Sequence, residues 1–86
     1  LVHFASLVPM VDVLMFGAKK YSPDNWKKGL DKKELLDSMA SHVTSLIDGE
    51  ECDQESKLHH IGHIMCNAMF YSFHYVILKD KPNNYE

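Results

Sequence analysis

The stretch from Leu58 to Val76 reads LHHIGHIMCNAMFYSFHYV, and it continues to Leu78 without one Asp, Glu, Lys or Arg. Charged residues make up 24% of the whole chain, so this run is unusually apolar for its surroundings. A helix that is apolar almost all round is buried inside a protein. The run therefore predicts the central helix of the fold.

Five polar side chains interrupt this apolar run at the spacing of a helix. Separations of three, four, four and three residues place them in one stripe along a helix: His60, His63, Asn67, Tyr71 and His74. A solvated stripe would normally be rich in Lys, Glu and Gln. Imidazole, amide and phenol groups must be hydrogen-bonded or coordinated when buried. This polar stripe is therefore either a set of metal or phosphate ligands, or a structural seam against a partner helix.

The N-terminal third of the chain predicts one helix. Pro9 suits the first turn of a helix, and apolar residues then recur at helical spacing. We expect this helix over residues 9–21, after an extended lead-in over residues 1–8. The turn-forming sequence SPDN at residues 22–25 should end it, because Pro fixes φ while Asp and Asn can bond their own backbone.

Capping signals place the other two helices. Asp31 and Glu34 have the spacing of a capping box, and Gly49 is a natural terminator, so a second helix is expected over residues 32–48. The third helix should run over residues 56–79, from Ser56 to the stop signal Asp80-Lys81-Pro82.

The predicted fold is therefore all-α, a three-helix bundle in one domain over residues 1–86. A chain of 86 residues has a thin core and leaves much of its surface exposed, so we expect a homo-oligomer to complete the bundle. The chain begins with Leu1 rather than Met, which suggests a fragment of a longer protein.

Composition excludes several classes of partner. The net charge is −3 and the basic residues are scattered, so we expect no long nucleic acid. Cys52 and Cys66 are too few for a disulfide framework, which favours a cytoplasmic protein of a bacterium or of a phage-infected host. Residues 58–78 are long enough to cross a bilayer, but four His and one Asn make a poor lipid-facing helix. We therefore expect no membrane partner.

An acidic connection precedes the polar stripe. The sequence GEECDQES, from Gly49 to Ser56, holds four carboxylates directly ahead of His60 and His63. Oxygen ligands beside imidazoles suit Mg²⁺, Mn²⁺ or a mixed oxygen and nitrogen site, and such ions in turn bind nucleotide phosphates. The alternative is a solvated acidic turn that favours the helix N-terminus through its dipole.

Two residues of the second helix add to this set. His42 lies on the apolar side of the helix, where it is either a hydrogen-bonded core residue or a ligand. Asp37 lies on the opposite, polar side with Ser41, Thr44 and Asp48. That side is either simply solvated or, because it lacks Lys and Arg, part of a site.

Three blocks of sequence, in order, resemble a known family. They are FGAKKYSPDNWKKG (Phe16 to Gly29), LLDSMASH (Leu35 to His42) and GEECDQES followed by HxxH and Asn (Gly49 to Asn67). Together they are similar to the small phage and prophage family called dATP/dGTP diphosphohydrolase, N-terminal, over residues 9–78. Two positions depart from its pattern, since Ser41 stands where Arg is common and Lys57 where Gly is usual.

The resemblance implies metal-dependent cleavage of a purine deoxynucleoside triphosphate, dGTP or dATP, to the monophosphate and pyrophosphate. It also implies an architecture similar to the all-α nucleoside triphosphate pyrophosphohydrolases, which work as dimers or tetramers. The usual signature of those enzymes, ExxE on one helix and ExxD on the next, is absent here, so their ligand set is not transferred.

From these residues and the resemblance together, we assign roles to residues of this chain as a hypothesis. The metal ion, Mg²⁺ or Mn²⁺ with Zn²⁺ or Co²⁺ as further candidates, is expected on Asp53, Glu55, His60 and His63. The expected catalytic residues are His42, to orient water or phosphate, and Asp37, as a base or further oxygen ligand. The expected substrate-binding residues are Lys20, Asn25 and Lys28 for phosphates, Tyr21 and Trp26 for the purine ring, and Asn67 as an orienting group.

Alternatives remain open at this point. Trp26 could instead hold its loop against the core. The protein could be a non-catalytic phage protein that sequesters a nucleotide, which would retain its ligand without turnover. It could also be a helical interaction module whose histidines only align partner helices, and such a module would bind no nucleotide.

Overall fold

The computed structural model describes residues 1–80 of the chain and builds them from helices. Three helices carry the fold: α1 (Val8–Lys20), α2 (Lys32–Ile47) and α3 (His60–Ser72). α3 continues directly into the π-helix η3 (Phe73–Ile77) and the short α4 (Leu78–Asp80). Within residues 1–80 the only β-type pairing is an isolated bridge between Cys52 and His59. The all-α prediction is confirmed.

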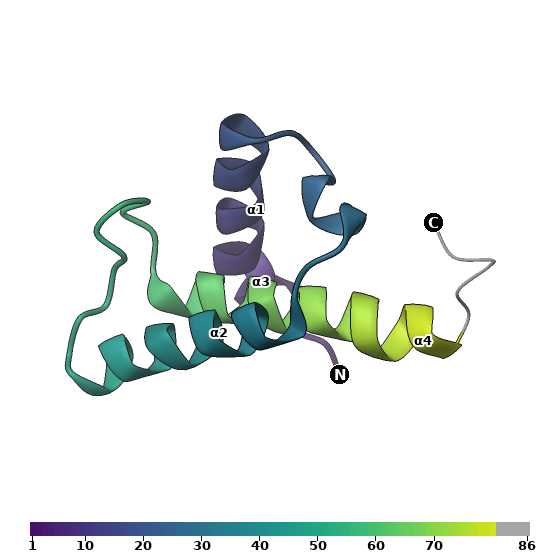
Figure 1. Ribbon diagram of the computed structural model, residues 1–86. Coiled ribbons are helices and arrows are strands. Elements are labelled where there is room, and N and C mark those ends of the chain that lie inside the picture. The colour runs from purple at the N-terminus through teal and green to yellow at the C-terminus, as the bar shows by residue number, and fades with distance from the viewer. Residues whose placement is uncertain (81–86) are drawn as a thin grey trace.

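The apolar run of the sequence forms the central helix, as predicted. Figure 1 shows α2 lying along α3 while α1 stands across it, and α3 contacts both of the other helices. In the described part of the chain the buried apolar side chains are Leu35 on α2 and Cys66 on α3. No helix in that part has the length and apolar character that a membrane span requires.

The capping signals of α2 act as predicted. The Oδ2 atom of Asp31 accepts a hydrogen bond of 3.0 Å from the backbone N–H of Glu34, which satisfies one of the free donors at a helix start. Gly49 has a φ of +92°, a conformation that glycine adopts without a steric penalty. α2 therefore begins at the predicted residue and ends at Ile47, one residue before the predicted end.

The extended lead-in predicted over residues 1–8 is wrong in part. Phe4–Leu7 form a 3₁₀-helix, η1, and α1 begins at Val8 rather than at Pro9. After α1, the predicted turn is present, with Asp24 in the left-handed region at a φ of +64°. A further 3₁₀-helix, η2 (Asn25–Lys28), follows this turn and was not predicted.

The predicted start of the third helix at Ser56 is also wrong, because α3 begins at His60. The side chain of Asp53 accepts a bond of 2.9 Å from the N–H of Ser56, and this local bond competes with a helical turn. Lys57 then takes a left-handed φ of +66°. The cap is His59, whose Nδ1 accepts a bond of 3.0 Å from the N–H of Ile61. The helical course continues to Asp80, and the rest of the predicted stop lies outside the described residues.

α1 crosses α3 at very close range. A Cβ atom on Gly62 would lie 2.3 Å from the carbonyl oxygen of Pro9, so a residue without a side chain is needed at this point. One turn later, the Sγ atom of Cys66 donates a weak hydrogen bond of 3.3 Å to the carbonyl of Met10. Two small residues of α3 thus set the position of α1.

Candidate functional site

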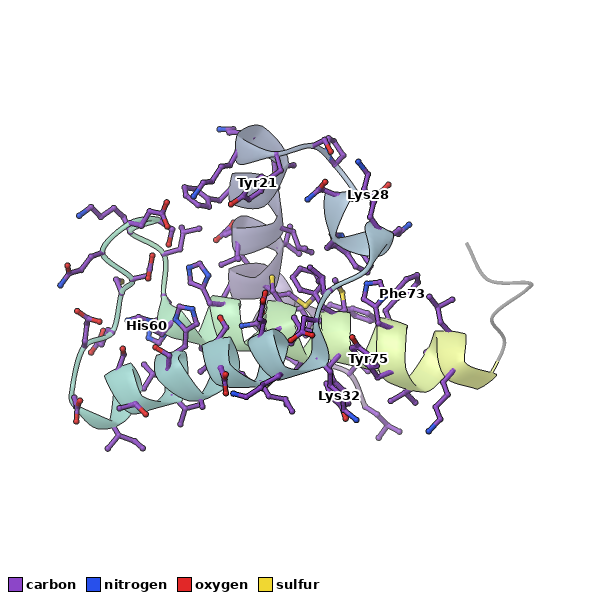
Figure 2. The ribbon with its side chains drawn as sticks, in the orientation of Figure 1. Tyr21, Lys28, Lys32, His60, Phe73 and Tyr75 are labelled. Carbon is purple, nitrogen blue, oxygen red and sulfur yellow. The ribbon has the colours of Figure 1, made fainter. Side chains whose placement is uncertain are left out.

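Three metal-ligand side chains meet where α2, α3 and the acidic connection come together. One ligand atom each of His42, Asp53 and His60 lies within 4.8 Å of the other two. We call these three residues the His–Asp cluster. They come from three separate segments of the chain, and Figure 2 shows His60 on the side of α3 that faces α2.

His60 is at the centre of this cluster and is only 3% exposed. Its Nε2 atom lies 2.9 Å from Oε1 of Glu50, and its Nδ1 atom lies 2.7 Å from Nδ1 of His42. Because a carboxylate can only accept, the proton of the neutral His60 ring is on Nε2. The Nδ1 lone pair of His60 therefore points into the cluster and accepts from Nδ1–H of His42.

His63 extends the cluster by one more ring. It stacks on His42 with ring centroids 4.6 Å apart and an angle of 5° between the planes. Its Nε2 atom lies 2.8 Å from Oγ of Ser56 and 3.9 Å from Oδ2 of Asp53. His63 therefore faces the same carboxylate as the cluster but at a longer distance.

The charges of the cluster follow from these contacts. The backbone N–H of Ser56 holds the pKa of Asp53 below its usual value, and the hydrogen bond from His60 does the same for Glu50. Burial lowers the pKa of His42, and the neighbouring imidazoles of His63 and His60 lower it further. Burial likewise lowers the pKa of His63. Ionised carboxylates beside neutral imidazoles are the forms that bind metal ions.

The donor set fits a divalent metal ion. Imidazole nitrogens suit borderline ions such as Co²⁺ or Zn²⁺, and the carboxylate oxygen also suits Mn²⁺, while Mg²⁺ prefers oxygen ligands. A metal-binding histidine almost always donates its other N–H to a carboxylate or carbonyl. The bond from His60 to Glu50 has this form.

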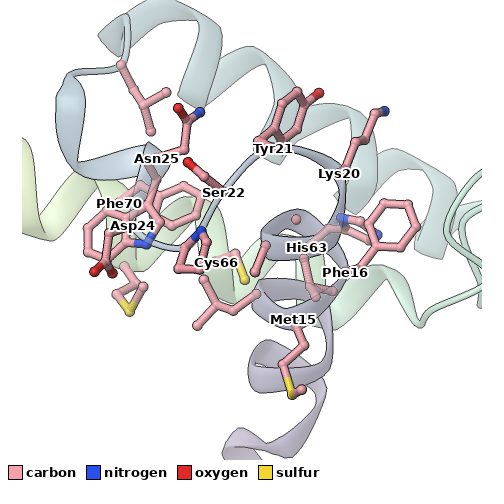
Figure 3. A pocket seen from close by; sticks show the side chains of 18 of the residues that line it. Met15, Phe16, Lys20, Tyr21, Ser22, Asp24, Asn25, His63, Cys66 and Phe70 are labelled. Atoms are coloured by element: carbon pink, nitrogen blue, oxygen red, sulfur yellow. The ribbon is translucent and has the colours of Figure 1, made fainter.

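A large pocket adjoins the cluster. It has a volume of about 670 Å³ and lies between α1, the turn that follows α1, and α3. Figure 3 shows Phe16, Lys20 and His63 on one side of this pocket, and Asn25 and Phe70 on the other. His63 thus contributes both to the pocket and to the surroundings of the cluster.

Comparison with known families matches residues 1–82 to the family described as dATP/dGTP diphosphohydrolase, N-terminal. The chain belongs to this family. A curated relative, the dATP/dGTP diphosphohydrolase of Salmonella phage PMBT28, is 35% identical over 72 residues. The aligned part is 84% of this chain but only 23% of the relative. No solved structure matches the chain.

The first and third sequence blocks that resemble this family meet at the pocket. Four of the expected substrate-binding residues line it: Lys20, Tyr21, Asn25 and Trp26. Two of the expected metal ligands, Glu55 and His63, line it as well. The ring of Trp26 also stacks on Phe70 at 5.0 Å, so it holds the loop against α3 in addition to lining the pocket.

Three expected site residues of the family pattern lie elsewhere. Asp37 is exposed and pairs with Lys33 at 2.7 Å, because its position on α2 turns it away from the side that carries His42. Asn67 donates to Oγ of Ser38 at 3.1 Å and lines a second, smaller pocket. Lys28 is exposed and does not line the large pocket.

Glu55 does not join the His–Asp cluster either. Its Oε2 atom lies 2.6 Å from Nζ of Lys20, although the sequence predicts these two residues for metal and phosphate respectively. The two groups face each other across the edge of the pocket. His42 was assigned to orient water or phosphate, and the structure places it among the potential ligands.

Sequence reasoning assigned no role in the site to two residues that organise it. Glu50 bonds the ring of His60, and Ser56 bonds both Asp53 and His63. Both belong to the block GEECDQES. A carboxylate at a distance of ten residues from a histidine gives no periodic signal, so only the folded connection reveals the pairing.

Proposed function

We propose that this chain binds a divalent metal ion and hydrolyses a purine deoxynucleoside triphosphate, dGTP or dATP, to the monophosphate and pyrophosphate. One observation carries the proposal: a cluster of potential metal ligands adjoins a pocket large enough for a nucleotide, with His63 shared between them. The family of the chain and the name of its phage relative support the choice of substrate.

His42, Asp53 and His60 would hold the metal ion. Glu50 keeps the proton of His60 on Nε2 and leaves Nδ1 free to bind, while His42 would bind through Nδ1 after its proton shifts to Nε2. When bound, a divalent ion supplies charge neutralisation for the polyphosphate and lowers the pKa of a water molecule.

His63 would act on the water rather than on the metal. Burial lowers the pKa of His63, so its ring is neutral near pH 7 and can accept a proton, as a general base must. Its Nε2–H donates to Oγ of Ser56 at 2.8 Å, because the Ser56 hydroxyl donates to Asp53, so the nitrogen that would accept the proton is Nδ1. In this role His63 would orient the attacking water, which the sequence predicted for His42.

The pocket would bind the rest of the substrate. Lys20 is the one lysine or arginine among the residues that line the described pocket, so it is the candidate contact for phosphates. Tyr21 is 66% exposed at the pocket edge, and its ring is able to stack on a purine. Most of the other lining residues are apolar, as is usual for a site that buries a base.

The direct test measures pyrophosphate release from dGTP and dATP by the purified chain with Mn²⁺ or Mg²⁺. We expect release by the wild type and none by His60→Asn, which loses a ligand. His59→Asn is the matched control, because Asn preserves the helix cap and His59 lies outside the cluster. Circular dichroism would check that both variants fold.

Two outcomes contradict the proposal. A wild-type chain that is inert towards all common nucleotides with several metals excludes the hydrolase activity for this chain. Tight nucleotide retention without turnover, unaffected by a chelator, would instead identify a non-catalytic nucleotide-binding protein.

A further inference from the structure

The central helix changes its winding where it passes the loop after α1. The residues Phe73–Ile77 form a π-helix, η3, inside an otherwise α-helical run. Such segments are rare, are less favourable than a regular helix, and occur frequently at functional sites. In Figure 2, Phe73 and Tyr75 lie beneath the loop that carries Lys28. The change of winding therefore falls where α3 meets that loop.

Two consecutive residues of η3 bind the backbone of this loop, residues 22–30. Nε2 of His74 donates to the carbonyl oxygen of Trp26 at 2.7 Å, and the hydroxyl of Tyr75 donates to the carbonyl oxygen of Leu30. Consecutive side chains on an α-helix point about 100° apart. A π-helix has more residues per turn, so the two side chains point in more similar directions and can reach one segment.

The two carbonyls lie on either side of an irregular part of the loop. Between them the backbone passes Gly29, which has a φ of +122°. The bonds from His74 and Tyr75 therefore hold the backbone on both sides of the turn at Gly29. The ring of Trp26 adds a second anchor, because it stacks on Phe70 and meets Phe73 edge-on, each with ring centroids 5.0 Å apart.

The same loop forms one wall of the large pocket. Ser22, Asn25, Trp26 and Leu30 are among the residues that line it. His74 and Tyr75 do not line the pocket themselves, so they act on it only through the loop. A small displacement of the loop would change the shape of the pocket while leaving the His–Asp cluster intact.

We propose that His74 and Tyr75 are positioning residues that hold the loop of residues 22–30 in its pocket-forming conformation. The link to nucleotide affinity rests on the proposed function, but the positioning itself can be measured without it. Neither residue belongs to the three blocks of sequence that carry the resemblance to the family.

The first experiment uses Trp26, the only tryptophan of the chain, as a probe of the loop. We expect His74→Ala and Tyr75→Phe to make Trp26 more accessible to quenching by acrylamide. His74→Gln should restore the wild-type value, because its amide N–H can replace that of the imidazole. Tyr71→Phe on α3 and His3→Gln near the N-terminus are matched controls that should not change quenching.

The second experiment separates positioning from general stabilisation. For His74→Ala and Tyr75→Phe we expect KM for dGTP to rise about fivefold with kcat unchanged, which corresponds to the loss of about 1 kcal/mol, the net contribution of one hydrogen bond. His74→Gln should keep the wild-type KM. All measurements are made well below the melting temperature of each variant.

Each result decides between the two roles. If His74→Ala and Tyr75→Phe lower the melting temperature but leave Trp26 quenching at the wild-type value, the residues only stabilise the helix and the proposal is overturned. If His74→Gln behaves like His74→Ala, the hydrogen bond is not what holds the loop. If the wild type does not bind or cleave nucleotides, the proposed function fails, while the quenching series still decides whether the two residues position the loop.

Discussion

The two sides of α3 are built on different principles. On the side that faces α2 and the acidic connection, imidazoles and carboxylates are joined by directional contacts of 2.7 to 2.9 Å around His60. On the side that faces α1, the backbone at Gly62 approaches Pro9 directly, and a pocket of about 670 Å³ remains beside this crossing.

This difference separates two requirements of a site. Chemistry at a metal ion needs a few atoms at fixed positions, which paired polar groups provide. Binding of a large substrate needs an open space with a suitable lining. Two helices that cross closely at one end of α1 can leave such a space at its other end. In the proposed function α3 would serve both, because one side carries polar groups and the other carries small residues.

The largest expected difference is between the reactivities of the two thiols, and it tests whether α1 stays packed against α3. Burial raises the pKa of Cys66 to about 12 from an ordinary value of 9.0, so its thiolate should be about a thousandfold rarer than that of a free thiol. Cys52 is exposed. We expect a disulfide reagent, followed by mass spectrometry, to modify Cys52 rapidly and Cys66 only slowly.

Unfolding in urea is the control, since it should make the two rates similar. Equal rates in native buffer would mean that α1 separates readily from α3, and the contrast between the two sides would fail.

The next largest expected effect is on metal affinity, on the side of α3 that faces α2. Glu50→Gln removes the carboxylate that fixes the ring of His60, and loss of such a supporting group typically lowers metal affinity by about 10- to 100-fold. Titration of Mn²⁺ or Zn²⁺ by calorimetry would measure the change. Glu51→Gln is the matched control, because its side chain is exposed and lies outside the cluster. If both variants bind the metal ion with equal affinity, Glu50 does not support the metal site.

On the side of α3 that faces α1, the free energy of unfolding should depend on side-chain volume instead. Gly62→Ala places a Cβ 2.3 Å from the carbonyl oxygen of Pro9, and overpacking of this kind costs about 1 to 3 kcal/mol of unfolding free energy. Gly17→Ala is the opposite case, because nothing lies within 4 Å of its Cβ position. It should stabilise α1 by about 0.5 to 1 kcal/mol. Urea denaturation would show whether the free energy of unfolding falls in Gly62→Ala and rises in Gly17→Ala.

The two sides also differ in how far the sequence predicts them. Helix periodicity and caps predict three helices and the bounds of α2 within one residue. The acidic block directly ahead of His60 predicts that Asp53 and His60 lie close together, as they do. The close crossing at Gly62 and the pocket are not predictable in this way, because both depend on which residues of two distant helices meet. The late start of α3 has a local cause, the bonds from Ser56 to Asp53, which outweigh helix propensity.

The ion pair between Lys20 and Glu55 also departs from the sequence prediction, which assigned Glu55 to the metal ion and Lys20 to phosphates. Both side chains are largely exposed, at 42% and 67%, and a single exposed pair of this kind contributes little to stability. Glu55→Gln should therefore leave the melting temperature nearly unchanged.

Its effect on binding decides between the two roles of Glu55. If Glu55 only neutralises Lys20, Glu55→Gln frees that ammonium group for phosphate and should lower KM for dGTP by a few-fold, with metal affinity unchanged. The gain should shrink at high salt, because interactions between exposed charges are screened. If Glu55 is a metal ligand, the same variant would weaken metal binding as Glu50→Gln does. Calorimetry with the metal ion and measurement of KM at two salt concentrations distinguish these two results. Weaker metal binding by Glu55→Gln would extend the cluster to the edge of the pocket.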